Sequence, residues 1–321
     1  MLSVRTLPLL LAVGGLCGCV APSEPAPAPV EAAAPLAWDY DDGGADALVS
    51  AAALTARLQQ AVVLARTFDA GPILAGYDAA MRSQAPGCPH YLGLGEFQYW
   101  YDDCVTPTGD RFDGYTFFAE TPDSADYTHD GLALWGASDI TLADGRVFHL
   151  GGRVEGSVAE GQGQKVWLSR VSGTFRWDGA EADGTWLGEG YALDLEMIGN
   201  RFADGSDGRG LQLQGGIDGF SAPLGTVRFE GVVVTAGAGA GAGDTGDTGA
   251  DLSCAAEPTG GISARDDAGH WYELRVDGGD TEASDAARCD GCGTVWFEGA
   301  ALYEVCLDFT PLTDWDDSGP W

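Results

Sequence analysis

The chain has 321 residues, and 49 acidic side chains against 16 Lys and Arg give it a formal net charge of −33. This charge would repel phosphate, so the composition excludes the basic surface that nucleic-acid binding needs. Hydrophobic residues at 45%, with ten Trp, argue against disorder, while 49 Gly argue against a mainly helical fold.

The N-terminus has the pattern of a secretion signal. Arg5 precedes an apolar run over residues 7–16, which is too short to span a bilayer. The following Leu16-Cys17-Gly18-Cys19 resembles the lipobox of bacterial lipoproteins, with Cys19 at the lipidated position. We therefore expect residues 1–18 to be a signal peptide and Cys19 to carry a lipid anchor. The alternative is an ordinary signal peptide followed by a chance Cys.

The residues after Cys19 predict where the anchored chain goes. Residue 20 is Val and not Asp, which under the enteric sorting rule directs a lipoprotein to the outer membrane. Residues 19–37 are rich in Pro and Ala and are typical of a semi-rigid tether. We expect a bacterial cell-envelope protein whose first partner is the membrane that holds its anchor, on its periplasmic or surface face.

A helical segment over residues 38–87 should follow the tether. Apolar residues recur at three- and four-residue spacing within residues 45–68, which predicts an amphipathic helix capped by Asp46. Gly71-Pro72 should end it, and a shorter helix is expected over residues 72–82. Both helices need an apolar partner, which we expect to be the sheet that follows.

We expect residues 88–235 to form an antiparallel β domain, because residues from about 111 to 235 have the period-two pattern of antiparallel strands with one face exposed to water. Clear alternation predicts strands at 146–158, 165–177, 190–197 and 226–234, and Asp-Gly pairs mark turns between them. A loose repeat of the form Arg-Φ-x-Gly, where Φ is apolar, begins at Arg111, Arg153, Arg170 and Arg228. Glycine within a strand permits bending or a bulge, so we expect a strongly curved sheet.

Residues 236–252 read as a flexible Gly, Ala, Asp and Thr linker, which we interpret as a domain boundary. Beyond it, residues 253–321 should form a small domain with hairpins at 262–277 and 294–309 and an acidic tail. The predicted fold class is mainly β (α+β): a curved antiparallel sheet covered by N-terminal helices, plus a small disulfide-stapled C-terminal β module.

Six cysteines remain after the signal, and an exported chain should pair them as disulfides. Cys88 and Cys104 lie far from the others in sequence, so we pair them. The other four allow three pairings, of which Cys289–Cys292 with Cys254–Cys306 is slightly favoured. A redox CxxC or a zinc site at these four is less favoured, because neither a βαβ pattern nor a second CxxC is present.

Several motifs together resemble those of uncharacterised lipoproteins of myxobacterial-type bacteria. They are the lipobox, the Pro/Ala tether, the pair Cys88 and Cys104, the GDTGDTG linker, and the C-terminal module that contains CDGCG and EVCLDF. The resemblance covers about half of the chain and implies an envelope lipoprotein with disulfides. It implies no activity and no catalytic or binding residues.

Sequence motifs for chemistry are weak. The four His form no HExxH motif and show no metal spacing, although His129-Asp130 could be half of a triad. By strand alternation, Glu189 falls on the same face as Leu187, Tyr191 and Leu193, which we expect to point inward. It is therefore a candidate ligand-facing or general-acid carboxylate, unless a bulge at a neighbouring Gly turns it outward. Acidic motifs at 204–208 and 244–249 resemble fragments of calcium loops but lack the full spacing, so no cofactor is assigned and calcium is the one candidate.

Aromatic residues gather at 97–101, inside the loop that a Cys88–Cys104 disulfide would close. Tyr99, Trp100 and Tyr101 could form a stacking platform for a ligand, but we favour their being a lid on the core. The leading hypothesis is an envelope lipoprotein with a non-enzymatic binding role, toward a glycan, a hydrophobic ligand or an envelope protein. The alternatives are a secreted glycan hydrolase that uses paired carboxylates and a purely structural envelope protein.

Overall fold

One antiparallel sheet runs through the computed structural model, which describes residues 48–94, 97–121, 128–161, 164–177, 190–202, 209–236, 256–277 and 291–313. Within these residues thirteen strands follow one another in chain order, each paired with the next. Their bounds are β1 His90–Leu94, β2 Phe97–Val105, β3 Arg111–Thr121, β4 Thr128–Thr141, β5 Val147–Gly161, β6 Gln164–Trp177, β7 Tyr191–Phe202, β8 Arg209–Asp218, β9 Leu224–Ala236, β10 Ala256–Asp266, β11 Trp271–Asp277, β12 Cys292–Phe297 and β13 Ala300–Cys306. The predicted mainly β fold class is confirmed.

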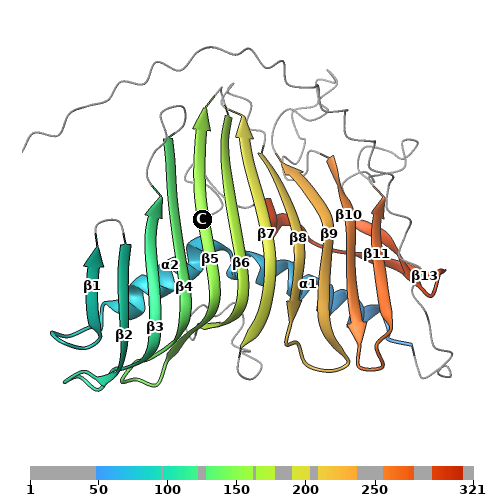
Figure 1. Cartoon of the computed structure of the whole chain (residues 1–321). Helices are drawn as coiled ribbons and strands as arrows, with labels where there is room; N and C mark the ends of the chain where they lie inside the picture. Colours follow the sequence, from blue (N-terminus) through green and yellow to red (C-terminus); the bar gives the residue numbers. More distant parts are fainter. Residues whose placement is uncertain are drawn as a thin grey trace, which may run out of the picture. The chain divides into compact units, whose positions relative to one another are not determined.

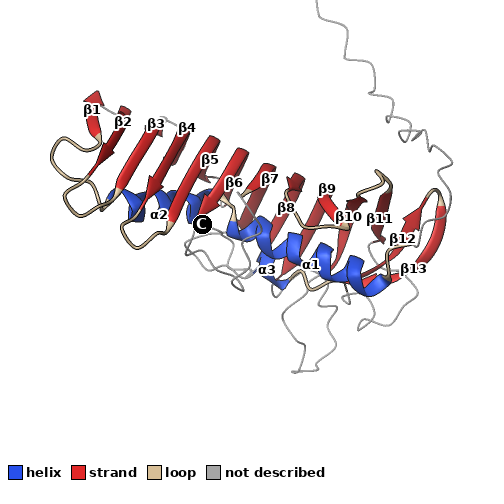
Figure 2. Cartoon of the chain, turned by 90° about the horizontal axis from the view of Figure 1, so that it is seen from below, coloured by secondary structure: helices blue, strands red, loops and turns tan. Residues whose placement is uncertain are grey.

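Two helices cover one face of this sheet (Figure 1). Helix α2, Ala70–Met81, contacts β5 and β6, while α1, Ala51–Thr67, contacts β9, β10 and β13. Figure 2 shows both helices on the same side of the strands, together with the short helix α3, Thr310–Thr313. Within the described part of the chain, no helix combines the length and apolar character needed to cross a membrane.

The helices begin where side chains can cap them. The side chain of Ser50 accepts a hydrogen bond from the amide of Ala53 and caps α1, so this helix starts after the predicted position at residue 45. Asp69 caps α2 in the same way through the amide of Gly71. Pro72 lies in the first turn of α2, where its missing N–H has no partner to lose.

The core lies between the helices and the strand residues that face them. Along most of the strands the side chains that point to the helices are buried, as the period-two pattern predicts, whereas the edge strand β1 is exposed. The helices contribute residues such as Leu58 and Tyr77, both almost fully buried. The sheet contributes Trp100, Phe112, Leu150, Val171, Leu195, Phe229 and their neighbours.

The Arg-Φ-x-Gly repeat has a structural explanation. At each copy the apolar residue is buried toward the helices: Phe112, Val154, Val171 and Phe229. Strand alternation then places the preceding Arg and the following x residue on the opposite face. In three of the four copies the closing Gly has a positive φ: 97° at Gly114, 130° at Gly173 and 59° at Gly231.

Gly173 allows a close approach between β5 and β6. An added Cβ would lie 2.5 Å from the carbonyl oxygen of Gly151 and 2.6 Å from the Cα of Gly152. Because the φ of Gly173 also disfavours any side chain, Gly173→Ala is expected to lower the free energy of unfolding by about 2 kcal/mol. Urea unfolding measures this change. Gly93→Ala is the control, since its φ is not positive and its added Cβ meets nothing within 4 Å, and equal losses in both variants would contradict the prediction.

The C-terminal strands continue the main sheet. Strand β10 pairs antiparallel with β9 over positions that run from Ala256↔Thr235 to Asp266↔Leu224. Both strands belong to the single unit Gly43–Trp321. The predicted linker connects neighbouring strands, and residues 237–255 lie outside the described residues, as do the signal peptide, Cys19 and the tether.

Two disulfides are described, and one corrects the predicted pairing. Cys88–Cys104 forms as expected and ties the segment before β1 to the end of β2. Cys292 pairs with Cys306 across β12 and β13, so the favoured pairs Cys289–Cys292 and Cys254–Cys306 are wrong. The two strands align these residues as direct cross-strand neighbours, which sequence spacing does not reveal. Cys254 and Cys289 lie outside the described residues.

Candidate functional site

The face of the sheet opposite the helices, here called the open face, carries two adjoining surfaces. On β2 to β4 it displays aromatic rings, and on β5 to β9 it displays charged and amide side chains. The rows of strand pairing join them, because Trp135 of β4 is the direct partner of Arg153 of β5. A ligand lying across the strands would meet rings first and polar groups next.

The aromatic platform consists of six residues on three neighbouring strands: Phe97, Tyr99, Tyr101, Tyr115, Phe117 and Trp135. Tyr99 is paired in register with Phe117, and Phe117 with Trp135, so the three form a row across the sheet. Phe97, Tyr101 and Tyr115 are between 42% and 51% exposed, which is high for large rings. Exposed apolar patches of this kind mark binding surfaces more often than single exposed side chains do.

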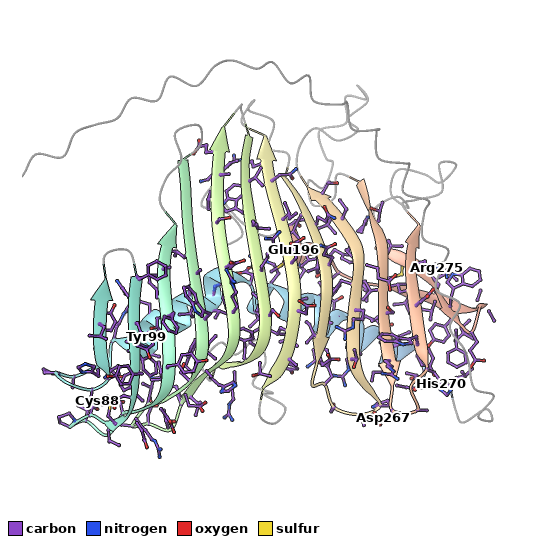
Figure 3. All side chains as sticks on the ribbon, in the orientation of Figure 1. Cys88, Tyr99, Glu196, Asp267, His270 and Arg275 are labelled. Carbon is purple, nitrogen blue, oxygen red and sulfur yellow. A yellow bond between two sulfur atoms is a disulfide. The ribbon has the colours of Figure 1, made fainter. Side chains whose placement is uncertain are left out.

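The rings of the platform stack on one another and hold a fixed arrangement. The ring centroids of Tyr99 and Phe117 are 4.3 Å apart, and the planes of Phe117 and Trp135 lie within 8° of parallel at 5.4 Å. Tyr101 stacks on Tyr99 at 5.5 Å, and Phe97 meets the edge of Trp135. Such contacts stabilise the platform before any ligand arrives. Figure 3 labels Tyr99 on β2.

The predicted cluster at 97–101 divides between the two faces. Trp100 is fully buried toward the helices, where its Nε1 donates to the hydroxyl of Tyr77 at 2.9 Å. It therefore belongs to the lid of the core and is not available to a surface ligand. Tyr99 and Tyr101 point to the open face and belong to the aromatic platform. The two interpretations of this cluster apply to alternate residues of one strand.

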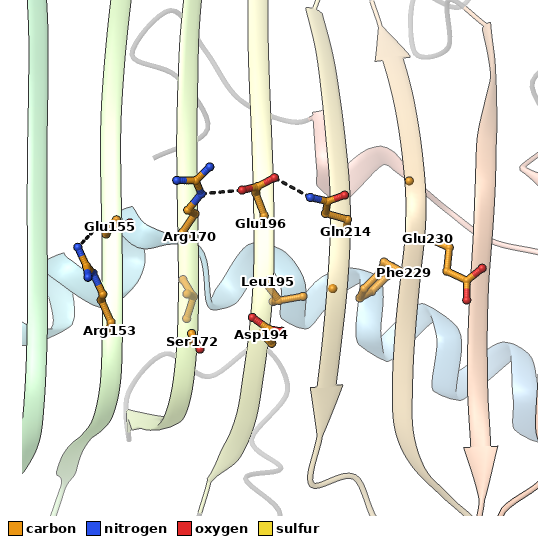
Figure 4. Close-up of a pocket in the computed structure, with 13 residues that line it drawn as sticks. Arg153, Glu155, Arg170, Ser172, Asp194, Leu195, Glu196, Gln214, Phe229 and Glu230 are labelled. Carbon is orange, nitrogen blue, oxygen red and sulfur yellow. Dashed lines mark hydrogen bonds and ion pairs between the residues drawn. The ribbon is translucent and has the colours of Figure 1, made fainter. Parts of the chain in front are cut away.

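Next to the platform lies an open depression of about 820 Å³. Its polar side chains come from β5 to β9 and are shown in Figure 4. We call it the polar groove, and the side chains that define it are Arg153, Glu155, Arg170, Ser172, Asp194, Glu196, Gln214 and Glu230. Gly215 and Gly231, on β8 and β9, also line it.

Ion pairs fix part of the polar groove. Glu196 accepts hydrogen bonds from Arg170 Nε and from Gln214 Nε2, both at 2.6 Å, so both of its carboxylate oxygens are engaged. The hydrogen bond to Glu196, together with the charge of that carboxylate, raises the pKa of Arg170. Arg153 pairs with Glu155 along β5. Asp194 and Glu230 are exposed on the open face and offer their carboxylates to solvent or a ligand.

Several predicted site residues lie outside the described residues. These are Glu189, the acidic motifs at 204–208 and 244–249, and the side chains of His129 and Asp130. In the described part of the chain, ligand atoms of Cys292, Glu304 and Cys306 lie within 4.8 Å of one another. Because the two sulfurs form a disulfide, they are not the thiolates that a zinc site requires.

Most of the open face was missed by sequence reasoning. Tyr115, Phe117 and Trp135 are not identified as candidate binding residues from the sequence, although the sequence contains a pattern that places two of them. In each Arg-Φ-x-Gly repeat the Φ residue is buried, so the residues at odd distances from it along the strand point to the open face. Applied to β3, this rule places Tyr115 and Phe117 together with Arg111 on the open face. Alignment of these strands with Tyr99 needs the register, which no local pattern supplies.

Comparisons with known proteins give no relative. The chain matches no family model, and no curated protein and no solved structure is significantly similar to it.

Proposed function

We propose that this chain is an envelope lipoprotein that binds an extended, uncharged glycan along its open face. The observation that carries the proposal is the exposed row of stacked rings that runs directly into a polar groove. Sugar rings have apolar C–H faces and polar hydroxyl edges. An aromatic surface beside carboxylate, guanidinium and amide groups offers a partner to each of these.

The charge of the chain supports a neutral ligand. At a net charge of −33, nucleic acid and anionic membrane surfaces are repelled at long range. The groove itself contains both signs, with Arg170 bound to Glu196 and Arg153 bound to Glu155. Such pairs accept and donate hydrogen bonds without presenting a strong net charge, which suits hydroxyl groups better than ionic ones.

Anchoring of the chain in the cell envelope is part of the same proposal. Cys19 would carry the lipid, and the Pro/Ala tether would hold the open face away from the bilayer. The Cys88–Cys104 and Cys292–Cys306 disulfides support an oxidising compartment, since such bonds are rare in the cytosol. A glycan of the envelope or of the surroundings would then be within reach.

Binding can be measured by titration calorimetry against hexasaccharides of β-1,4-linked glucose and of β-1,4-linked N-acetylglucosamine. We expect binding of at least one, and a loss of about 10- to 100-fold in affinity in the Tyr99→Ala, Phe117→Ala double variant, because each ring contributes one stacking surface. Tyr91→Ala is the matched control, since Tyr91 is 42% exposed but lies on the other face of β1.

Two outcomes would contradict the proposal. The first is equal weakening of binding by the Tyr91 variant and the platform variant, which would remove the open face from the interaction. The second is a lack of binding to both neutral oligosaccharides by the folded wild-type protein, which would favour a structural role for the chain.

A further inference from the structure

Three side chains on neighbouring strands of the open face form a continuous hydrogen-bonded relay. Asp139 on β4 lies 2.8 Å from Nδ1 of His149 on β5. The other ring nitrogen of His149, Nε2, lies 3.1 Å from the hydroxyl Oγ1 of Thr174 on β6. A carboxylate, an imidazole and a hydroxyl linked in this order are the parts of a nucleophilic catalytic triad.

The order of the groups fixes the direction of proton transfer. An ionised Asp139 only accepts hydrogen bonds, so Nδ1 of His149 must carry the proton that joins them. Nε2 is then the acceptor for the hydroxyl of Thr174 and is able to take its proton. Since Asp139 is 54% exposed and His149 is 29% exposed, the relay is accessible to a substrate from solvent.

The backbone makes room for the contact between His149 and Thr174. Residue 151 lies between them in the pairing of β5 with β6, directly opposite Thr174, and it is Gly. A Cβ at this position would collide with Oγ1 of Thr174 and would lie 3.1 Å from Nε2 of His149. The reacting pair therefore depends on the absence of a side chain at Gly151.

The relay lines a pocket of about 540 Å³ on the open face. Arg176, the register partner of His149, contributes to the same lining, and so do Gly190 and Gly219. The polar groove is lined by a different set of side chains, so the relay is a separate site. A pocket of this volume holds a small-molecule ligand, and it lies next to the nucleophile, as a substrate pocket must.

We propose that Asp139, His149 and Thr174 form an esterase site for small-molecule carboxylic esters. Thr174 Oγ1 adds to the ester carbonyl carbon while His149 Nε2 takes the hydroxyl proton. The tetrahedral adduct collapses, the C–O bond to the leaving group breaks, and the alcohol departs with the proton from His149. Water, deprotonated by His149 Nε2, then adds to the acyl-threonine carbonyl. The bond to Thr174 Oγ1 breaks, Thr174 takes the proton back from His149, and the carboxylic acid is released. Asp139 is a positioning residue that holds the imidazole.

The chain offers an internal control for this proposal. His270 also contacts a carboxylate, with Nδ1 at 3.3 Å from Asp266. Its ring packs against the edge of Phe297, and no described hydroxyl is hydrogen-bonded to it. A His–Asp pair without a nucleophile should not catalyse acyl transfer, so changing His270 tests for nonspecific imidazole reactivity. Figure 3 labels His270 near the turn between β10 and β11.

The experiment uses the full chain and p-nitrophenyl acetate as the probe. Release of p-nitrophenolate gives the rate, and acid quenching followed by tryptic digestion locates any acetyl group. We expect acetylation of Thr174 in the peptide 171–176, and about a 100-fold lower kcat/KM in Thr174→Val and His149→Gln. His270→Gln should retain the activity, and in Thr174→Ser, which keeps a hydroxyl, the acetyl group should still be found in the peptide 171–176. Asp139→Asn should lower kcat with little change in KM.

Failure of the esterase proposal can be distinguished from failure of the glycan-binding proposal, because the Tyr99→Ala, Phe117→Ala double variant leaves Asp139, His149 and Thr174 unchanged. A rate that persists in Thr174→Val, or acetyl groups found at other residues only, would overturn the proposal. So would a wild-type rate equal to that of buffer with no acetylated peptide. Because the relay residues are partly exposed, the variants should keep the wild-type unfolding midpoint. If Thr174→Val does not fold, the loss of activity in His149→Gln and the position of the acetyl group in the wild type provide the test.

Discussion

Replacing Trp100 by Ala is expected to lower the free energy of unfolding by about 4 kcal/mol, in the range found for large buried aromatic residues. Trp100 is fully buried, and its ring lies edge-on to Phe112 with centroids 5.7 Å apart. Its Nε1 donates to the hydroxyl of Tyr77, which attaches α2 to β2. The variant would leave both a cavity and an unpaired hydroxyl beneath the helix.

The neighbouring residue provides a matched control for this change. Tyr101 lies on the same strand but is 48% exposed on the open face, so Tyr101→Ala should cost less than about 1 kcal/mol. Urea unfolding, followed by Trp fluorescence and circular dichroism, measures both. If Tyr101→Ala destabilised the fold as much as Trp100→Ala does, the assignment of the two faces of β2 would be wrong.

Asp69 is expected to make stability depend on pH in the direction opposite to that of most carboxylates. Its side chain is fully buried at the start of α2, where it caps Gly71 and pairs with Arg66. Burial raises the pKa of Asp69 to about 7, although Arg66 and the amide of Gly71 lower it. The folded chain therefore holds this proton more tightly than the unfolded chain, whose Asp pKa is near 4.

The sign of the effect follows from this difference. Between about pH 4 and pH 7, unfolding releases the proton of Asp69. The contribution of this residue to stability is therefore complete below pH 4, decreases as the pH rises from 4 to 7, and is lost above pH 7. The variant Asp69→Asn does not titrate at this position. Between pH 4 and pH 7, the free energy of unfolding of the wild type should therefore fall by up to about 4 kcal/mol relative to that of the variant. The difference between the two proteins removes the contribution of the other acids.

Asp110 supplies the contrasting control. Hydrogen bonds from the hydroxyl of Thr108 and the amide of Ala143 lower its pKa. Its contribution to stability is therefore present above the ordinary pKa of Asp and decreases as the pH falls below about 4. Chemical unfolding of Asp69→Asn and Asp110→Asn from pH 3 to pH 8 compares the two. If the stability of the wild type relative to Asp69→Asn increased with pH, the prediction would be wrong, and Arg66 would be keeping the carboxylate of Asp69 charged.

The two residues with the largest expected effects on stability, Trp100 and Asp69, lie away from the proposed sites on the open face. Trp100 points from the sheet toward the helices and Asp69 caps α2, whereas the aromatic platform, the polar groove and the relay of His149 lie on the opposite face of the sheet. Variants that destabilise the fold should therefore lie on the side of the sheet that the helices cover, and variants that affect function should lie on the open face. A binding or catalytic loss caused by an open-face variant with an unchanged unfolding midpoint would be assigned to the site itself.

The sequence alone determined the local structure. Three- and four-residue spacing predicted the helices, and period-two alternation predicted β5, β6, β7 and β9, because both patterns depend on neighbours within a few residues. The predicted hairpin at 262–277 is confirmed as β10 and β11, with its turn at the expected Asp266–Gly269. The pairing of Cys88 with Cys104 is confirmed for a similar reason, since the two are close in sequence and far from the others.

Only the tertiary structure decided which face of the sheet is covered and which residues meet on the other. Alternation separates Trp100 from Tyr99, but the position of α2 determines which of the two is buried. Cys292 meets Cys306, and His149 meets Thr174 across 25 residues of sequence, because the strands pair in one register. A shift by one residue would move every side chain to the opposite face, and this register is set by the packing of the whole sheet against its helices.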